Sequence, residues 1–383
     1  MKKTFRIFVG GMFAFLMAGC SNVDVDDVNA QTGLPNAIYL DGVQSSPIKK
    51  VVVDEKGGEA TFLPRAANLL TSDVKVDITV DEASLELYNK QYGTSYKVLP
   101  AEYYEIEKTS VTIKSGTVST EPVKLVIRDG ALTVNPSFKY AVPVKVSTNS
   151  SLSVLEANSY EIFALDRVLK TSAMRQDGFY MRCDLVPLPH DKNPMVLKEW
   201  TLHYGMKIDS WFANQQPVMG SFYSRITPEG KLQYKPGGSD DPKGFSKQSI
   251  QKNKWYHVTY TYKNQHVKAY INGVLEFEFD VPSTNEEYYK IQASFGNFKG
   301  YLRDIRLYKK ALTNFQITEN LYVEDPANPD LIVYAPLTEE SKLSDVTGNG
   351  YHFKAYISNS DNPYSLDLIK WDSPLYFPEK NNK

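Results

Sequence analysis

The sequence has little cysteine, no surplus of charge of either sign and, beyond its first twenty residues, no long apolar run. Cys20 and Cys183 are the two cysteines, and 43 lysines and arginines stand against 45 aspartates and glutamates, for a net charge of −2. No basic stripe or zinc-ligand spacing appears, which argues against a nucleic-acid partner. No later segment approaches the ~20 apolar residues of a membrane-spanning helix.

Histidines are also few, and they are scattered. No two of them have the i, i+4 spacing of a metal-binding helix, and no Gly-x-Ser-x-Gly segment presents a nucleophilic serine. Hydrolysis by a Ser-His-Asp system is therefore disfavoured, although a triad assembled across the fold stays open. The five histidines are His190, His203, His257, His266 and His352.

The amino terminus has the order of a secretory signal. Two lysines and an arginine precede an apolar stretch from Ile7 to Ala18, which is too short to span a bilayer stably. The segment Leu16–Cys20 resembles the lipobox of bacterial lipoproteins, in which the cysteine becomes diacylated. An ordinary signal peptide with an incidental cysteine is the alternative. We predict a lipoprotein signal over residues 1–20, with Cys20 as a lipid anchor rather than a disulfide partner.

Residues 21–35 are polar, acidic and without periodicity, which predicts a flexible tether. Asp24, Asp26 and Asp27 are similar to the acidic residues that direct such lipoproteins to the outer face of the outer membrane, although three other residues follow the cysteine first. The resemblance implies a lipid-anchored outer-membrane protein that faces the cell exterior.

Short strand-like stretches separated by turn residues follow the tether. The alternation from Lys75 to Val80 has the period of two that marks half-buried strands. One stretch differs, because apolar residues three apart lie between Asp81, which can cap a helix, and Gly93, which can end one. We predict an Ig-like β-sandwich over residues 36–165 that contains one short helix.

A set of turn, core and helix positions in this region matches a known family. The positions are Tyr88, Asn89, Leu99, Pro100, Tyr103, Gly116, Tyr140, Pro143 and Val144. With them the region resembles the N-terminal β-sandwich domain of unknown function in Bacteroidota surface lipoproteins of glycan-utilisation systems. None of these residues has catalytic chemistry, so the resemblance implies a spacer or presentation domain.

Residues 165–178 link this domain to a second β-rich region, in which three stretches carry family motifs. The matching residues are Trp255, His257, Tyr270, Asn272, Gly273, Gly300, Asp304, Tyr308, Ala311, Leu312, Ile317, Asp345, Gly348, Asn349 and Gly350. With them the region resembles laminin-G/concanavalin A-like jelly rolls, although the stretch around Asp345 usually opens such a domain and here lies near the C-terminus. The resemblance implies a jelly-roll sandwich over residues 170–383, with His257 in a structural role.

Glu276 and Glu278 are the candidate catalytic residues. Some concanavalin A-like glycosidases use two strand carboxylates, and alternate strand residues stand about 6.6 Å apart at Cα, close to the 5–5.5 Å that retaining chemistry needs between carboxyl groups. A two-residue turn at Asn272–Gly273 would put both glutamates on the apolar side, whereas a bulged loop would put them beside His266 and Lys268. Burial of unpaired carboxylates is costly and the family's catalytic motif is missing, so a solvated face is favoured.

Asp304 and Asp345 are weak candidates for a structural calcium, which related jelly rolls often hold with carboxylates and backbone carbonyls. The alternative for Asp345 is an Asx turn in which Gly348 and Gly350 supply positive φ. The sequence fixes no cofactor.

Aromatic residues beside amides are the features that suit sugar binding. Aromatics make up 13% of the chain, an excess that strands favour and that sugar stacking also uses. Trp200 and Trp255 lie within strand patterns and are predicted core residues. The candidate ligand-binding residues lie in one loop-like stretch, and packing of its tryptophan onto the sandwich is the alternative. They are Trp211, Phe212, Asn214, Gln215 and Gln216.

These features predict a lipid-anchored, two-domain, all-β protein that captures a glycan for an outer-membrane uptake system without cleaving it. The expected partners are the glycan, the transporter and neighbouring surface lipoproteins. A jelly-roll glycoside hydrolase that uses Glu276 and Glu278 is one alternative. An adhesin or structural surface protein is the other.

Overall fold

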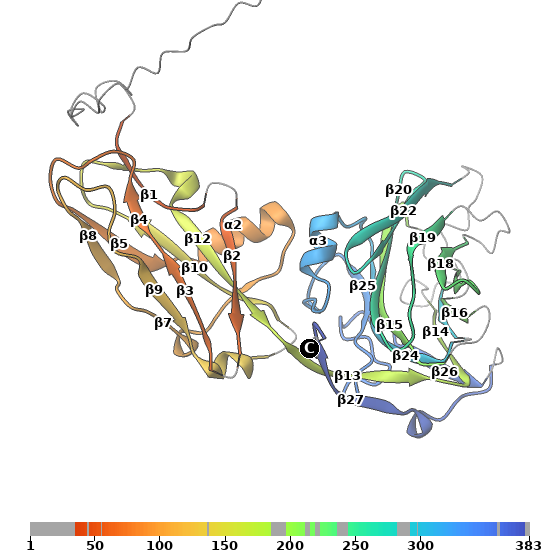
Figure 1. Ribbon diagram of the computed structural model, residues 1–383. Coiled ribbons are helices and arrows are strands. Elements are labelled where there is room, and N and C mark those ends of the chain that lie inside the picture. The colour runs from red at the N-terminus through yellow and green to blue at the C-terminus, as the bar shows by residue number, and fades with distance from the viewer. Residues whose placement is uncertain are drawn as a thin grey trace, which may run out of the picture.

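The computed structural model describes residues 35–379, except residues 44–45, 55, 136–137, 185–196, 211–214, 219–222, 236–243, 282–291, 297 and 358–360. The described residues form two β-sandwich units that lie side by side (Figure 1). Strands dominate both units, which confirms the predicted all-β fold class. Within the described part of the chain, no helix is long and apolar enough to cross a bilayer.

The N-terminal unit encloses one hydrophobic cluster between three sheets. Its strands are β1 Ala37–Leu40, β2 Ile48–Val53, β3 Gly58–Phe62, β4 Pro64–Ala66, β5 Val74–Val80, β6 Lys97–Val98, β7 Tyr104–Ile106, β8 Ser110–Ile113, β9 Val123–Ile127, β10 Tyr140–Ser147, β11 Ser153–Val154 and β12 Tyr160–Arg167. The main sheet has the order β2-β12-β10-β5-β8, with β6 paired to β10. Two three-stranded sheets, β11-β1-β4 and β3-β9-β7, complete the unit.

The predicted helix is present as α2, Glu82–Tyr92. The Asp81 side chain accepts a hydrogen bond from the Ser84 backbone N–H at 3.2 Å, and Gly93 ends the helix at a left-handed φ of 64°. Leu85 is buried on the side of the helix that packs against the main sheet. Both helix boundaries predicted from the sequence are confirmed.

The second unit is a sandwich around the larger hydrophobic cluster. Its strands are β13 Leu169–Gln176, β14 Phe179–Asp184, β15 Glu199–Ile208, β16 Gln215–Val218, β17 Ser224–Ile226, β18 Lys231–Tyr234, β19 Gly244–Ser249, β20 Trp255–Lys263, β21 His266–Ile271, β22 Val274–Asp280, β23 Gln292–Phe295, β24 Gly300–Tyr308, β25 Leu331–Ala335, β26 Lys354–Ile357 and β27 Trp371–Phe377. The larger sheet has the order β22-β21-β20-β15-β24-β13-β27, with β25 paired to β24. The smaller layer consists of β23-β14-β26 and β16-β17-β18-β19, with β16 next to β23.

Strand alternation sorts the aromatic residues of the larger sheet. Trp200 and Tyr204 of β15 face the core between the two layers and are fully buried. Trp255 is also buried, but it lies on the opposite side of the sheet against Phe377 of β27, at 5.2 Å between ring centroids. The sequence correctly predicts both tryptophans as core residues.

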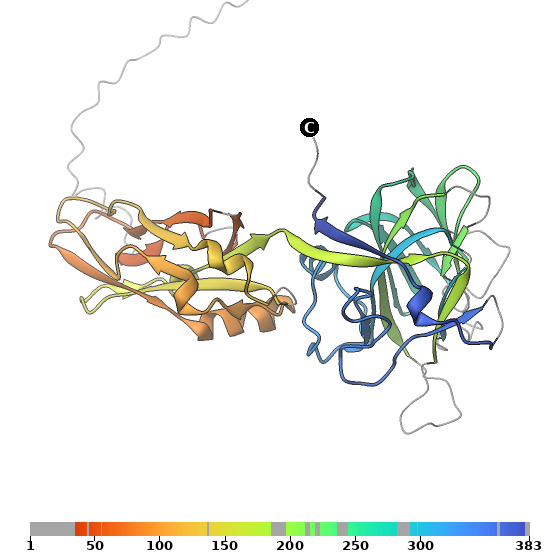
Figure 2. The ribbon, with the colours of Figure 1, turned by 90° about the horizontal axis from the view of Figure 1, so that it is seen from below.

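The two units are joined by a strand rather than by a loose linker. Val168 alone separates β12, in the N-terminal unit, from β13, in the larger sheet (Figure 2). The side chain of Arg167 donates hydrogen bonds to the backbone carbonyls of Val134 at 2.7 Å and Phe138 at 2.6 Å. The crossing strand is therefore fastened to the N-terminal unit at the point where it leaves.

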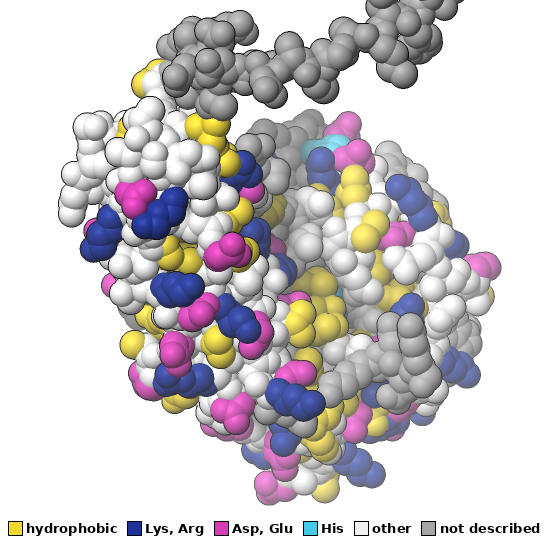
Figure 3. All heavy atoms as spheres, turned by 60° about the vertical axis from the view of Figure 1, so that its left-hand side comes forward, with side chains coloured by type: hydrophobic (Ala, Val, Ile, Leu, Met, Phe, Trp, Pro, Cys, Tyr) yellow, Lys and Arg dark blue, Asp and Glu magenta, His cyan; other side chains and the backbone are white. Residues whose placement is uncertain are grey.

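A polar contact also connects the units. Helix α3, Asn314–Glu319, lies opposite α2 (Figure 1). The Tyr96 hydroxyl donates to Glu319 at 2.6 Å, and the Lys139 ammonium donates to the Asn320 side chain at 2.7 Å. Burial lowers the pKa of Lys139 to about 8, while Glu319 acts in the opposite direction. On the face that Figure 3 shows, positive and negative side chains are interspersed.

Candidate functional site

Of the five candidate sugar-binding residues, Trp211, Phe212 and Asn214 lie outside the described residues. Gln215 is buried, and its amide is used within the protein: it donates to the Ser210 carbonyl at 2.6 Å and accepts from the Lys299 backbone N–H at 3.0 Å. These bonds connect β16 to Lys299, the residue before β24. Gln215 therefore has a structural role, and its prediction as a ligand-binding residue is corrected. Gln216, the next residue, is half-buried.

An aromatic and guanidinium cluster lies on the outward side of the smaller layer. Alternate residues of β14, such as Met181, enter the core, which leaves Tyr180 and Arg182 on the outward side. Tyr180 pairs directly with Tyr356 of β26. The Arg182 guanidinium lies 3.9 Å from the centroid of the Tyr356 ring and also pairs with Asp361 at 2.7 Å. We call the outward side of β14, β26 and β16–β19 the outer face.

The same face has a second group of polar and aromatic side chains on β17, β18 and β19. Arg225 pairs with Gln233, and its Nε donates to the Gln233 side-chain oxygen at 2.5 Å. Gln233, which is buried, pairs in turn with Phe245, which is 43% exposed. A guanidinium can bond to paired hydroxyls, and an exposed ring can cover an apolar sugar face, while the buried Gln233 amide holds Arg225 in place. The outer face therefore combines the groups that saccharide recognition uses.

The two candidate catalytic glutamates are separated by a bulge. Ile271 pairs with Val274, which confirms a two-residue turn at Asn272–Gly273 with φ values of 52° and 78°. Tyr270 then pairs with Leu275 but Ala269 pairs with Phe277, so Glu276 is the extra residue. The hairpin therefore begins in the register of the two-residue turn. After the bulge it continues in the other register considered from the sequence, which places Glu278 opposite Lys268.

The bulge gives the two carboxylates different neighbours. Glu276 is buried and accepts hydrogen bonds from the backbone N–H groups of Lys247 and Gln248 at 2.7 and 3.1 Å, and from the Gln248 amide at 2.6 Å. Glu278 points outward and pairs with His266 at 3.1 Å and Lys268 at 3.2 Å. The prediction of a solvated face is correct for Glu278 and wrong for Glu276, which fastens β22 to β19.

The neighbours of Glu276 and Glu278 favour a structural role for both residues over a role in glycoside hydrolysis. Hydrogen bonds from His266 and Lys268 lower the pKa of Glu278, whereas a general acid needs a raised pKa. Glu276 is bonded to the three donors of β19 and is not open to a substrate. The described residues thus bring no acid and nucleophile together here.

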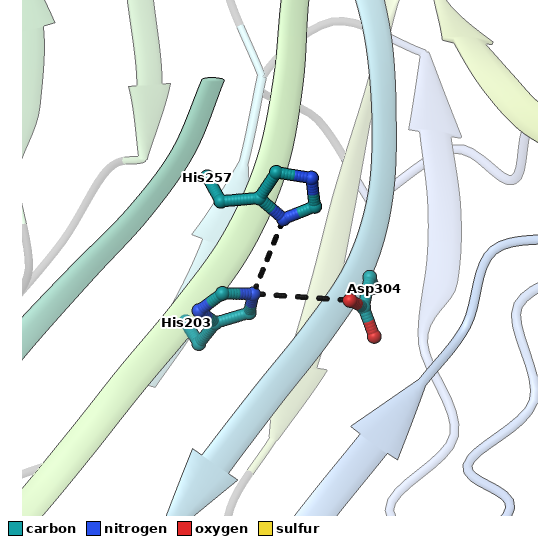
Figure 4. Close-up of side chains that lie close together, drawn as sticks. All are labelled: His203, His257 and Asp304. Carbon is teal, nitrogen blue, oxygen red and sulfur yellow. Dashed lines mark hydrogen bonds and ion pairs between the residues drawn. The ribbon is translucent and has the colours of Figure 1, made fainter. Parts of the chain in front are cut away.

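Asp304 lies in a buried ionic network on the side of the larger sheet that faces away from the core, and Figure 4 shows it beside His203 and His257. Arg306 donates to both carboxylate oxygens, at 2.8 and 2.5 Å. His203 Nε2 lies 3.8 Å from Asp304 Oδ2 and 3.5 Å from His257 Nδ1. Asp304 itself has a left-handed φ of 60°, at the irregularity where β24 shifts register against β15.

The nitrogen and oxygen atoms of His203, His257 and Asp304 lie within 4.8 Å of one another, as metal ligands would. Their surroundings do not suit a metal ion. Arg306 already occupies both oxygens of Asp304, and a second guanidinium, that of Arg303, lies 3.8 Å away. Calcium needs six to eight oxygen ligands, and these neighbours are cationic or imidazole groups. The Asp304 carboxylate is already paired with the Arg306 guanidinium.

The charges of the network follow from burial and from the two arginines. Burial would raise the pKa of Asp304, but the charges of Arg306 and Arg303 outweigh it and hold that pKa far below its usual range. Burial lowers the pKa of His203 to about 4 and that of His257 well below its ordinary value. At neutral pH the network therefore contains an ionised aspartate, two arginines and two neutral histidines.

Asp345, the other calcium candidate, closes a turn. Its side chain accepts backbone hydrogen bonds from Tyr334 at 3.0 Å, Thr347 at 3.1 Å and Tyr351 at 3.2 Å. Gly348 and Gly350 have φ values of 85° and 83°. This is the Asx-turn arrangement considered from the sequence, in which both oxygens of Asp345 accept hydrogen bonds from the turn and its neighbours.

Comparison with known families is consistent with these geometries. Residues 185–318 match the family model of the concanavalin A-like lectin/glucanases superfamily. The second unit has the concanavalin A-like fold. Residues 34–153 match a separate family model, described as that of an N-terminal domain. No curated protein matches the chain.

Several solved structures resemble the chain. A candidate carbohydrate-binding protein from Bacteroides ovatus ATCC 8483 has a TM-score of 0.51 and 20% identity, and the match covers 88% of this chain and 99% of that one. A two-domain protein of unknown function from Bacteroides fragilis NCTC 9343 has a TM-score of 0.31 and 14% identity, covering 73% and 95%. EndoBT-3987 from Bacteroides thetaiotaomicron, with a Man5GlcNAc product, has a TM-score of 0.28 and 24% identity, covering 34% and 31%. The first likeness shows a common fold, and the other two carry no argument.

Proposed function

We propose that the protein is a non-catalytic glycan-binding protein whose concanavalin A-like domain binds saccharide on the outer face. The observation that carries this proposal is the cluster of Tyr180, Tyr356 and Arg182, with two rings on adjacent strands and a guanidinium over one of them. Half-buried rings on the outward side of a sheet can stack on the apolar face of a pyranose, and a guanidinium held by Asp361 and Tyr356 is oriented beside them. The B. ovatus protein of the same fold, described as a candidate carbohydrate binder, is in keeping with this function.

We propose further that Cys20 carries the lipid anchor and that the protein acts on the outer surface of the outer membrane. There it would deliver oligo- or polysaccharide to a transporter, in company with neighbouring surface lipoproteins. The support is the charge, apolar and small-residue order of residues 1–20. Metabolic labelling with a fatty-acid analogue tests the anchor: the protein should incorporate the label, and a Cys20→Ala variant should not.

A glycan array probed with the protein lacking residues 1–20 tests the binding proposal, read for both retention and released product. We expect retention without product. Tyr356→Ala and Arg182→Ala should each weaken binding about tenfold, which corresponds to roughly 1.4 kcal/mol. Trp211→Ala should also weaken retention, and unchanged affinity across the glycans would remove Trp211 from the site.

Tyr376→Ala provides the matched control, because it removes an exposed ring from β27 of the larger sheet, away from the outer face. Released product would favour the hydrolase alternative. Retention that is equal in all variants would place the site elsewhere. No retention on any glycan would favour an adhesin that recognises protein.

A further inference from the structure

A pocket of about 590 Å³ lies on the side of the larger sheet opposite the outer face. Its walls come from β13, from the middle of β27, from the chain around Tyr322 and from the turn that follows β25. Arg303 of β24 lines it. A pocket of this size can hold a small ring-shaped ligand.

Arg303 is buried yet short of hydrogen-bond partners. The side chain is 3% exposed, and its Nε and Nη1 atoms have no hydrogen-bond partner among the described residues. The nearest anion, Asp304, is 3.8 Å from Nη1, and both of its oxygens accept from Arg306. Burial lowers the pKa of Arg303, as expected for a cation that is not fully compensated. A buried guanidinium with free donors is costly, and such groups call for an explanation.

The surrounding structure holds this arginine in place. A Cβ atom at Gly205 of β15 would lie 2.9 Å from Arg303 Cγ, so the absence of a side chain at Gly205 allows the arginine to lie across the strand. The ring of Phe377 lies 4.3 Å from the guanidinium carbon. The orientation of Arg303 is therefore fixed before any ligand arrives, which reduces the entropy lost on binding.

The remaining lining favours a carboxylate on a hydroxylated body. Hydroxyl groups of Ser172 and Ser341 line the pocket, and they can bond to ligand hydroxyls. Glu339 and Glu340 also line it and are exposed. Their charges, although screened by solvent, disfavour a phosphate dianion more than a singly charged carboxylate. A guanidinium fork matches a planar carboxylate with two parallel hydrogen bonds.

We propose that this pocket binds a carboxylate-bearing sugar of the hexuronic acid class, with the carboxylate against the Arg303 guanidinium. The choice of a sugar body rests on the proposed glycan-binding function, but the site is separate from the outer face. The protein would then hold acidic and neutral parts of a glycan at two different places.

Titration of the purified protein with glucuronate and galacturonate, followed by calorimetry or ligand-observed NMR, tests this proposal. Glucose, acetate and inorganic phosphate are the comparison ligands. At least one uronate should bind ten times or more tightly than glucose, acetate or phosphate. Equal binding of acetate would overturn the sugar part of the proposal, and tighter binding of phosphate or no uronate binding would overturn it entirely.

Two variants with opposite expected effects keep the test independent of folding. Arg303→Gln should weaken uronate binding at least tenfold. The surface double variant Glu339→Gln/Glu340→Gln should strengthen it severalfold, most clearly at low ionic strength. Weaker or unchanged binding in that double variant would contradict the proposal even if Arg303→Gln fails to fold. Because monosaccharide titration uses no array glycan, failure of the outer-face proposal is recognised separately.

Discussion

The two sides of the concanavalin A-like domain differ in how they treat charged and aromatic residues. On the larger sheet, the side that faces away from the core is covered by the chain around α3, and its charged residues are buried in the network of Asp304 and Arg306. On the smaller layer, Tyr180 and Tyr356 are half-buried on the outward side. The strongly shifted pKa values therefore mark the side that contains the ionic network, whereas the outer face is recognised by the aromatic and charged side chains at its surface.

The covered side of the larger sheet connects the sheet to the α3 segment and, through it, to the N-terminal unit. Arg306 donates to the Asn320 carbonyl as well as to Asp304, and the Tyr308 hydroxyl donates to Glu324 at 2.7 Å. Asn320 in turn accepts from Lys139 of the N-terminal unit at 2.7 Å. The network thus fastens the α3 segment to the sheet, and that segment holds the other domain.

Removal of the Asp304 charge should give the largest difference in stability between changes on the two sides of the domain. Asp304→Asn leaves two buried guanidinium groups without their anion, and breaking such a pair typically costs about 3–5 kcal/mol. Urea denaturation followed by tryptophan fluorescence measures the change. Asp361→Asn, which removes the exposed partner of Arg182 on the outer face, should leave the midpoint unchanged. A stable Asp304→Asn variant would show that the network is dispensable.

The neutral histidines of the covered side predict acid sensitivity. Below pH 6.5 the unfolded chain takes up protons on His203 and His257, whereas the folded domain does not, so stability is lost as pH falls. For His203, whose folded pKa is about 4, the loss approaches about 3 kcal/mol at pH 4. Denaturation at several pH values should show this slope, and His203→Gln should reduce it. An equal slope in the variant would mean that other groups cause the sensitivity.

The contact between the two domains should make a smaller contribution to the pH dependence of stability, and at a lower pH. Burial raises the pKa of Glu319, but the Tyr96 hydrogen bond and the charges of Lys139 and Lys50 outweigh it and lower the pKa. Its stabilisation is therefore complete above pH 4.5 and is lost as pH falls below that value.

Glu319→Gln should cost about 1.5–3 kcal/mol at pH 7, the usual range for hydrogen bonds to a charged group, and should loosen the domain arrangement. Small-angle scattering and denaturation are the measurements, with the exposed Glu156→Gln as control. Scattering curves that coincide for all three proteins would show that the β12–β13 strand alone sets the arrangement.

Glu278→Gln should have the smallest effect. The carboxylate is exposed and makes surface pairs with His266 and Lys268, so stability should stay within measurement error. Glycan retention should also be unchanged. If the protein releases sugar products and this variant abolishes that release, the hydrolase alternative is correct and the proposed function is wrong.

Local chemistry was readable from the sequence. Asp81 and Gly93 define the ends of α2, and Asn272–Gly273 forms the expected tight turn. The glycine-rich turn after Asp345 also follows from its residues. Each of these depends on neighbours within a few positions, so no knowledge of the tertiary structure is needed.

Features that depend on strands far apart in the sequence could not be predicted from the sequence. Glu276 is buried because backbone donors of β19 meet it at a bulge, and Gln215 is buried because Lys299 lies beside it. The network of Asp304 joins three strands, and its one local signal is the spacing of Arg303, Asp304 and Arg306 in β24. Pairing between strands far apart in sequence decides these environments.

Backbone hydrogen–deuterium exchange with and without a glycan that binds on the array tests the central claim most directly. The outer-face account predicts that glycan slows exchange in β14 and β26, next to Tyr180 and Tyr356, and leaves β2 and β12 of the N-terminal unit unchanged. Protection confined to the N-terminal unit, or to β22 around Glu276 and Glu278, would contradict the account.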